Sequence, residues 1–139
     1  MRMIIAGSRD IGTKKVNGRR VQLPLEECPW LEEAFNLCDW KHRITEIVSG
    51  KAIGVDNLGE QLADKFGLEK CIFPADWTRF GDRAGPLRNS DMADYTDIAI
   101  VVMKPGWSVG SRDMIRQMDK RKKPVLIFEV IGGKICPVR

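Results

Sequence analysis

The chain has 139 residues, of which 43% are hydrophobic and 30% are charged, and these values fit one globular domain over residues 1–139. No apolar run approaches the roughly 18 residues of a membrane span, and the first residues become polar too soon for a signal peptide, so we expect a cytoplasmic protein without a membrane partner. The net charge of +4 favours anionic partners but does not identify them.

Apolar runs alternate with helical patterns along the chain. Strands are predicted at residues 3–6, 44–48, 71–73, 98–102 and 125–128. Helices are predicted where apolar residues recur at helical spacing, around residues 31–38, 55–66, 87–95 and 114–118. This alternation predicts a Rossmann-like, three-layer α/β/α fold with a five-stranded, mainly parallel sheet and helices on both faces.

Two segments lie outside this alternation. The irregular insertion from Ser8 to Cys28 contains the turn sequence Asn17-Gly18, which predicts a small hairpin near residues 12–22. Near the other end, the glycine pair within residues 131–135 allows the chain to turn back as an edge strand.

Cysteine and histidine usage predicts neither a metal site nor a cofactor. The four cysteines form no CxxC pair, and His42 is the only histidine. We therefore expect reduced structural thiols and a surface histidine near a helix end.

Basic residues gather in two clusters, at residues 14–20 and 120–123. The first is either a solvated hairpin tip or a contact for nucleic acid. The second is expected to complement a helix dipole, because it ends a predicted helix, with a contact for nucleic acid as the alternative.

Glycine and serine follow the predicted strands. In parallel sheets ligands bind at the carboxyl ends of the strands, and the chain segments there are residues 6–10, 49–56, 74–89 and 105–112. Glycine lets a ligand approach the backbone, and free amides at a helix start attract an anion. Serine and glycine are also ordinary capping and turn residues, but several such loops on one edge favour a ligand site.

Four side chains in these loops are candidates for direct contacts. Arg88, expected in the first turn of a short helix, and Arg9 can grip a phosphate. Asn89 can bond a base or ribose, and Trp77 can stack on a base. Each has a plain alternative as a surface or packing residue. No Walker A or GxGxxG motif is present, so nicotinamide-linked hydride transfer has no support.

The loops together resemble the SLOG superfamily, which includes the DprA/Smf proteins and the LOG-type phosphoribohydrolases. The most similar group is the YspA-like or cpYpsA-related one of bacteria and phages. The motifs that carry the resemblance are residues 7–9, 48–56, 73–77, 84–89 and 108–115. The resemblance implies that the loop from Ser108 to Ser111 holds a phosphate and that Ser49, Gly50 and Asp56 line the pocket.

The chain departs from this pattern at two positions. Lys51 replaces the second glycine of the usual Ser-Gly-Gly-Ala, where it either narrows the pocket or contacts a phosphate. LOG-type enzymes carry a catalytic glutamate in PGGxGTxxE, and the aligned residue here is Met114, which cannot transfer protons. Asp56, Asp76 and Asp113 are the remaining candidate carboxylates, so binding or sensing of a nucleotide-derived ligand is favoured over hydrolysis.

The predicted ligand-binding residues are Gly7, Ser8, Arg9, Ser49, Gly50, Lys51, Gly54, Asp56, Trp77, Arg88, Asn89, Ser108, Gly110 and Ser111. The first alternative is a nucleotide N-glycosidase or phosphoribohydrolase-like enzyme. The second is single-stranded nucleic-acid binding of the DprA kind, through the basic insertion with Trp77, Phe80 and Trp107. A homo-oligomer is expected by analogy with SLOG proteins.

Overall fold

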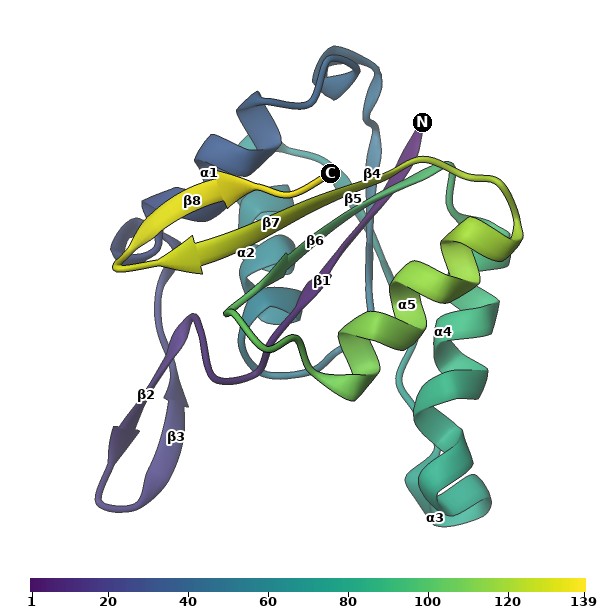
Figure 1. The fold of residues 1–139 in the computed structure, drawn as a ribbon, viewed down its shortest axis with the longest axis horizontal. Helices are drawn as coiled ribbons and strands as arrows, with labels where there is room; N and C mark the ends of the chain where they lie inside the picture. The colour runs from purple at the N-terminus through teal and green to yellow at the C-terminus, as the bar shows by residue number, and fades with distance from the viewer.

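Six strands form the central sheet of the protein, and its computed structural model describes residues 1–139 (Figure 1). They are β1 (Arg2–Gly7), β4 (Glu46–Ser49), β5 (Glu69–Ile72), β6 (Ile98–Met103), β7 (Val125–Ile131) and β8 (Lys134–Pro137). Their order is β5-β4-β1-β6-β7-β8, and only the β7–β8 pair is antiparallel. The mainly parallel sheet is confirmed, but the prediction of five strands is wrong, because the expected edge strand after Gly132-Gly133 pairs with β7 as a sixth.

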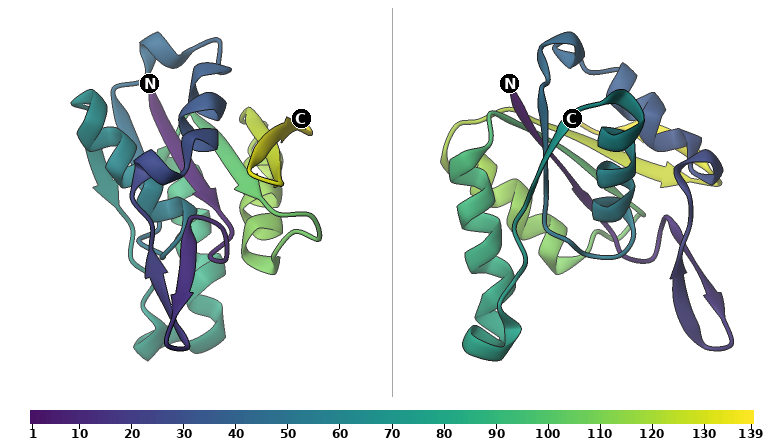
Figure 2. Two further views of the ribbon diagram at one scale, coloured as in Figure 1. Left: turned by 90° about the vertical axis from the view of Figure 1, so that its left-hand side faces the viewer. Right: turned by 180° about the vertical axis from the view of Figure 1, so that it is seen from behind.

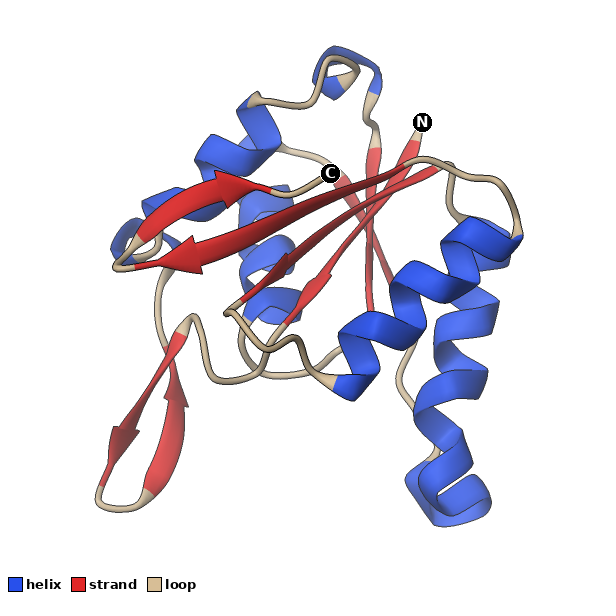
Figure 3. Ribbon diagram, viewed as in Figure 1, coloured by secondary structure: helices blue, strands red, loops and turns tan.

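Helices cover both faces of this sheet, as predicted (Figure 3). They are α1 (Pro29–Asn36), α2 (Val55–Phe66), α3 (Trp77–Phe80), α4 (Ala84–Tyr95) and α5 (Val109–Lys120), with single 3₁₀ turns at Leu25–Glu27, Lys41–Arg43 and Gly81–Arg83. Helices α1 and α2 pack on one face and α4 and α5 on the other, which divides the apolar core into two clusters. All six residues of β6 are buried, because a central parallel strand is covered from both sides.

The chain reverses its direction across the sheet between β1 and β6. From β1 it proceeds through α1 to β4 and β5 on one side, and then crosses through α4 to β6 on the other side (Figure 2). This order is consistent with a Rossmann-like fold, in which the crevice at the carboxyl ends of the two strands is the usual ligand position.

The hairpin predicted near residues 12–22 is present as β2 (Thr13–Val16) and β3 (Arg19–Gln22). Asn17 and Gly18 have φ of 51° and 78°, the positive values that a tight hairpin turn requires. The hairpin projects beyond the carboxyl edge of the sheet (Figure 2). At its base the Gln22 amide donates to the carbonyls of Gly12 and Gly54 at 3.0 and 3.3 Å.

The basic segment at residues 120–123 lies at the carboxyl end of α5, as predicted, and also contacts the carboxyl end of α4. The Lys123 ammonium donates to the carbonyls of Ala93, Asp94 and Thr96 at 2.7–3.0 Å, at the carboxyl end of α4. Cations at this end of a helix satisfy its last carbonyls.

His42, the only histidine, lies exposed in a 3₁₀ turn. None of the helices combines the length and the apolar character that crossing a membrane demands.

Candidate functional site

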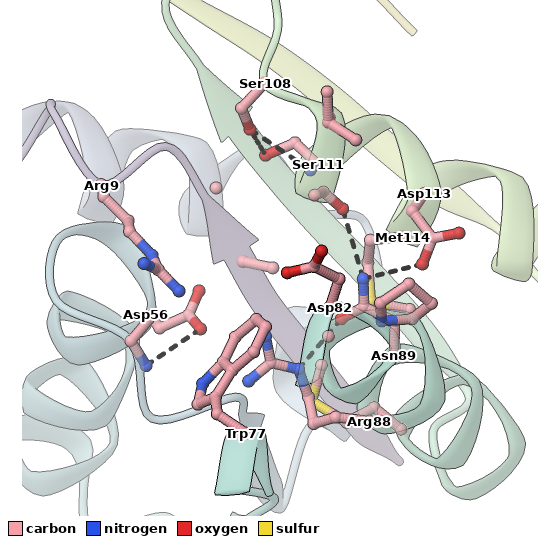
Figure 4. Close-up of a pocket in the computed structure, with 18 of the residues that line it drawn as sticks. Arg9, Asp56, Trp77, Asp82, Arg88, Asn89, Ser108, Ser111, Asp113 and Met114 are labelled. Atoms are coloured by element: carbon pink, nitrogen blue, oxygen red, sulfur yellow. Dashed lines mark hydrogen bonds between the residues drawn. The ribbon is translucent and has the colours of Figure 1, made fainter. Parts of the chain in front are cut away.

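A cavity of about 580 Å³ opens at the carboxyl ends of the central strands (Figure 4). This volume lies within the roughly 300–1,000 Å³ of small-molecule sites. The predicted site residues that line it are Gly7, Arg9, Asp56, Trp77, Arg88, Asn89, Ser108, Gly110, Ser111 and Asp113. The fold therefore gathers most of the predicted residues along one edge.

The start of α5 forms one wall of this cavity. Ser108 caps the helix: its hydroxyl accepts the Ser111 amide at 3.3 Å and donates to the Ser111 hydroxyl at 2.9 Å. The amides of Val109 and Gly110 have no acceptor within the chain, and the space beside the Gly110 Cα is open. These amides and the helix dipole make this wall suitable for an anion.

The floor of the cavity is the end of β1, where Gly7 lies against β6. A Cβ at Gly7 would overlap the Val102 carbonyl and come within 2.9 Å of the Val55 side chain. The neighbouring Ser8 and Gly54 do not line the cavity. Ser8 is buried and its hydroxyl accepts the Lys104 amide at 3.4 Å, while Gly54 lies against the Ser8 carbonyl with a φ of 92°. Both positions hold the loops together.

Ser49 also supports the loop after β4. Its buried hydroxyl donates to the Glu60 carboxylate at 2.7 Å and accepts the Lys51 amide at 3.1 Å. Gly50 and Lys51 line a smaller adjacent cavity of about 200 Å³, which shares Arg9, Trp77 and Arg88 with the main one. Lys51 is exposed, so it does not narrow the main cavity.

Asp56 is the buried carboxylate of the site, and its oxygen accepts the Ala52 amide at 3.3 Å. Burial raises the pKa of Asp56 to about 6, against the opposing effect of Arg88 and of the backbone amides. Arg88 is partly buried, and loss of hydration lowers its pKa, while the charge on Asp56 opposes that change. The two side chains and Arg9 approach each other at one side of the cavity (Figure 4).

Arg88 is held in place from two directions. Its guanidinium donates to the Gly50 carbonyl and, at 3.1 Å, to the Asn89 amide oxygen. The expectation that Arg88 lies in the first turn of a short helix is wrong, because the twelve-residue helix α4 begins at Ala84 and places Arg88 in its second turn. Trp77, expected in a loop, begins the short helix α3, and its ring packs 3.3 Å from the Cβ position of Gly85.

One comparison with known proteins finds a relative. Over 87 residues the chain is 31% identical to the Gene 61 protein of Mycobacterium phage D29, a match that spans 59% of this chain and 70% of the phage protein. The chain belongs to the family of this phage protein. No family model and no solved structure matches the chain. A phage relative fits the expected bacterial or phage origin, and its name states no activity.

Asn89 lines the cavity, as predicted, and it also connects two helices. Its side-chain amide donates to the Asp113 carboxylate at 3.0 Å and to the Gly110 carbonyl at 3.3 Å, and its oxygen accepts from Arg88. Asn89 and Asp113 are both buried. Asn89 therefore joins α4 to the start of α5, so that Arg88 and the free amides of α5 keep a fixed separation.

We expect Asn89→Ala to lower the free energy of unfolding by about 2–3 kcal/mol, because the buried Asp113 carboxylate would lose a partner. Urea unfolding followed by circular dichroism measures this change. Asn36→Ala is the matched control, since that exposed amide contacts only Lys41. Equal losses in the two variants would show that the bridge between the helices adds nothing.

The three candidate carboxylates differ in position. Asp76 caps α3 by accepting the Arg79 amide at 3.1 Å and does not line the cavity. Asp113 lines it but is engaged by Asn89 and Arg116, and Met114 is buried beside it. Asp56 is thus the buried carboxylate that faces the cavity without a salt bridge to a basic side chain.

Three further residues line the cavity although they are not among the predicted ligand-binding residues, namely Asp10, Arg20 and Asp82. Asp10 pairs with Lys104, and this hydrogen bond lowers the pKa of the Asp10 carboxyl. Asp82, in the turn before α4, points its carboxylate into the cavity (Figure 4). Arg20 belongs to the basic cluster of residues 14–20, but no motif indicates that its side chain or that of Asp82 reaches the cavity. Their positions depend on how the β2–β3 hairpin and the turn before α4 fold against the sheet.

Proposed function

We propose that the protein binds or senses a nucleotide or nucleotide-derived ligand in the 580 Å³ cavity, as a Rossmann-like member of the SLOG superfamily. One observation carries the proposal: the free amides of Val109 and Gly110, the guanidinium groups of Arg9 and Arg88, and the Trp77 ring all border the same cavity. Amides and arginines suit a phosphate, and an exposed indole suits a base.

These groups support one orientation for the proposed ligand. A phosphate at the start of α5 receives the Gly110 amide, and the arginines across the cavity neutralise further negative charge. The base then lies on Trp77, which is 50% exposed. Asp82, which forms no salt bridge, is positioned to accept a hydrogen bond from a ribose hydroxyl.

We also propose a cytoplasmic location for the protein, which its four free cysteines fit.

A thermal-shift panel of mononucleotides, dinucleotides, cyclic nucleotides and ADP-ribose tests this proposal. At a ligand concentration of about 100 times Kd, binding stabilises the folded state by about 2.7 kcal/mol, so at least one compound is expected to give a saturable rise in Tm. We expect Trp77→Ala to weaken that binding about 10-fold or more, because base stacking contributes roughly 1–3 kcal/mol.

Phe80→Ala is the control for this experiment. Phe80 is an exposed aromatic residue on the same short helix, but it does not line the cavity. Its replacement is expected to leave the affinity unchanged. A panel without any response, or equal losses in the two variants, would count against a nucleotide site that uses Trp77.

The alternative function is hydrolysis of an N-glycosidic bond, and the buried Asp56 carboxylate in the cavity favours it. A carboxyl group with a pKa of about 6 is suited to proton transfer near neutral pH. Incubation with AMP, CMP or NAD, followed by chromatography for the released base, tests this alternative. Release that Asp56→Asn abolishes would support an enzyme, and intact substrate after long incubation would leave only binding.

A further inference from the structure

The β2–β3 hairpin is a strongly basic surface that the cavity does not account for. Residues 13–22 contain Lys14, Lys15, Arg19 and Arg20 and no acidic residue. All four cations are exposed, and none forms a salt bridge. Only Arg20 lines the cavity, and its guanidinium donates to the hydroxyl of Thr13, in the other strand of the hairpin, at 3.1 Å.

The fold accounts for only one of these charges: Arg20 helps to lower the pKa of the Asp10 carboxyl in the cavity, whereas Lys14, Lys15 and Arg19 form no salt bridge. Lys15 lies directly opposite Arg20 in the hairpin register, and like charges in such a pair destabilise a two-stranded sheet. The apolar residues of the hairpin, Val16 and Val21, are 43% and 41% exposed, so no apolar packing offsets this repulsion. A two-stranded ribbon is marginally stable by itself. Binding to an external polyanion would remove the repulsion.

The cations occupy both faces of the ribbon. Residues that pair across an antiparallel ladder share a face, so Lys15 and Arg20 lie on one face, while Lys14 and Arg19 lie on the other. The hairpin also stands clear of the body beyond the carboxyl edge of the sheet (Figure 2). The complementary partner therefore presents negative charge on two sides of an inserted ribbon.

Double-stranded DNA has this arrangement. The major groove of B-DNA admits a two-stranded β-ribbon between two phosphate backbones, whereas A-form RNA has a major groove too narrow for it. A single strand instead requires aromatic side chains on which its bases stack. The hairpin has none, since Trp77 and Phe80 belong to a separate element, α3 (Figure 1).

We propose that the β2–β3 hairpin binds double-stranded DNA by entering a groove and contacting its phosphates, without reading the sequence. This binding is independent of the nucleotide proposed for the cavity, because Lys14, Lys15 and Arg19 lie outside the cavity lining. Loss of one function therefore leaves the other measurable.

Fluorescence anisotropy with a labelled 20-base-pair duplex tests the proposal, using a triple variant, Lys14→Ala with Lys15→Ala and Arg19→Ala. At low salt we expect the wild-type protein to bind the duplex. The affinity of the variant for the duplex is expected to be lower by a factor of about 10 or more. The slope of log K against log salt concentration is expected to become less steep by roughly 3, about 1 for each phosphate contact removed. Circular dichroism of the variant checks that it folds, since the three side chains are exposed.

A second triple variant separates the hairpin from net charge. Arg43, Lys120 and Lys134 are exposed and form no salt bridge, so replacing all three with alanine removes the same charge elsewhere. This control is expected to keep most of the affinity and the original salt slope. The proposal fails if the wild type does not bind the duplex, if both triple variants lose affinity equally, or if a 20-nucleotide single strand binds more tightly than the duplex.

Discussion

Gly7→Ala is expected to lower the free energy of unfolding by roughly 3–5 kcal/mol, because the Cβ position of Gly7 lies closer to a backbone atom than that of any other glycine in the chain. The new Cβ would overlap the Val102 carbonyl of the adjacent strand β6 and lie 2.9 Å from both its carbonyl carbon and the Val55 side chain. The Val102 carbonyl cannot turn away without further loss, because it accepts the Ser8 amide at 3.2 Å. Strands β1 and β6 would have to separate at the floor of the cavity.

Gly110→Ala provides the matched comparison, since it adds the same methyl group to the same cavity. No atom lies within 4 Å of the Cβ position of Gly110, and its φ is not positive. In a helical turn this replacement is expected to be neutral or stabilising by up to about 1 kcal/mol. Urea unfolding of both variants measures the contrast. A small loss for Gly7→Ala, near that of Gly110→Ala, would show that β1 and β6 are less closely packed at this edge.

The fold was largely predictable because its signals are local. Short apolar runs such as residues 98–102, followed by amphipathic segments, give the strand and helix sequence of a parallel sheet, and Asn17-Gly18 identifies the hairpin turn. The sixth strand was harder to count, because residues 134–137 are short and only partly buried. Their pairing with β7 depends on a neighbour and not on their own pattern.

The position of the site was predictable for a topological reason, but the roles of its side chains were not. Loops after parallel strands meet on one edge in any such sheet, so Gly7, Arg9 and Gly110 were expected together. Asn89 lines the cavity but also connects α4 and α5, whereas Ser49 lies outside the lining and binds Glu60. Whether a polar side chain faces a ligand or a second helix depends on contacts between elements distant in sequence, which spacing alone does not encode.

The contribution of Asp56 to the stability of the protein is expected to fall as pH rises from 4 to 7. Its folded-state pKa of about 6 exceeds its ordinary value of 3.8, so the folded state holds the proton more tightly. Stability from this group is therefore fully present below pH 3.8 and is lost as pH rises through about 6. Between pH 4 and pH 7 the loss is on the order of 2 kcal/mol.

Asp56→Asn isolates this contribution, since asparagine does not titrate but keeps an oxygen for the Ala52 amide. The free energy of unfolding of the variant minus that of the wild type is expected to grow by about 2 kcal/mol from pH 4 to pH 7. Asp64→Asn is the control, an exposed carboxylate on the same helix. A difference that stays constant with pH for Asp56→Asn would show that Asp56 is better solvated than its burial indicates.

The same protonation links stability to the proposed ligand. A neutral Asp56 leaves the charges of Arg88 and Arg9 free for a phosphate, whereas the ionised carboxylate competes with it. Nucleotide affinity in the wild type is therefore expected to rise as pH falls from 8 to 5, and Asp56→Asn is expected to bind tightly over the whole range. Calorimetric titrations with an identified nucleotide at each pH measure this dependence. If wild type and variant show the same pH profile, the Asp56 carboxylate does not act on the negative charge that Arg88 and Arg9 are proposed to neutralise, and that part of the proposed orientation is wrong.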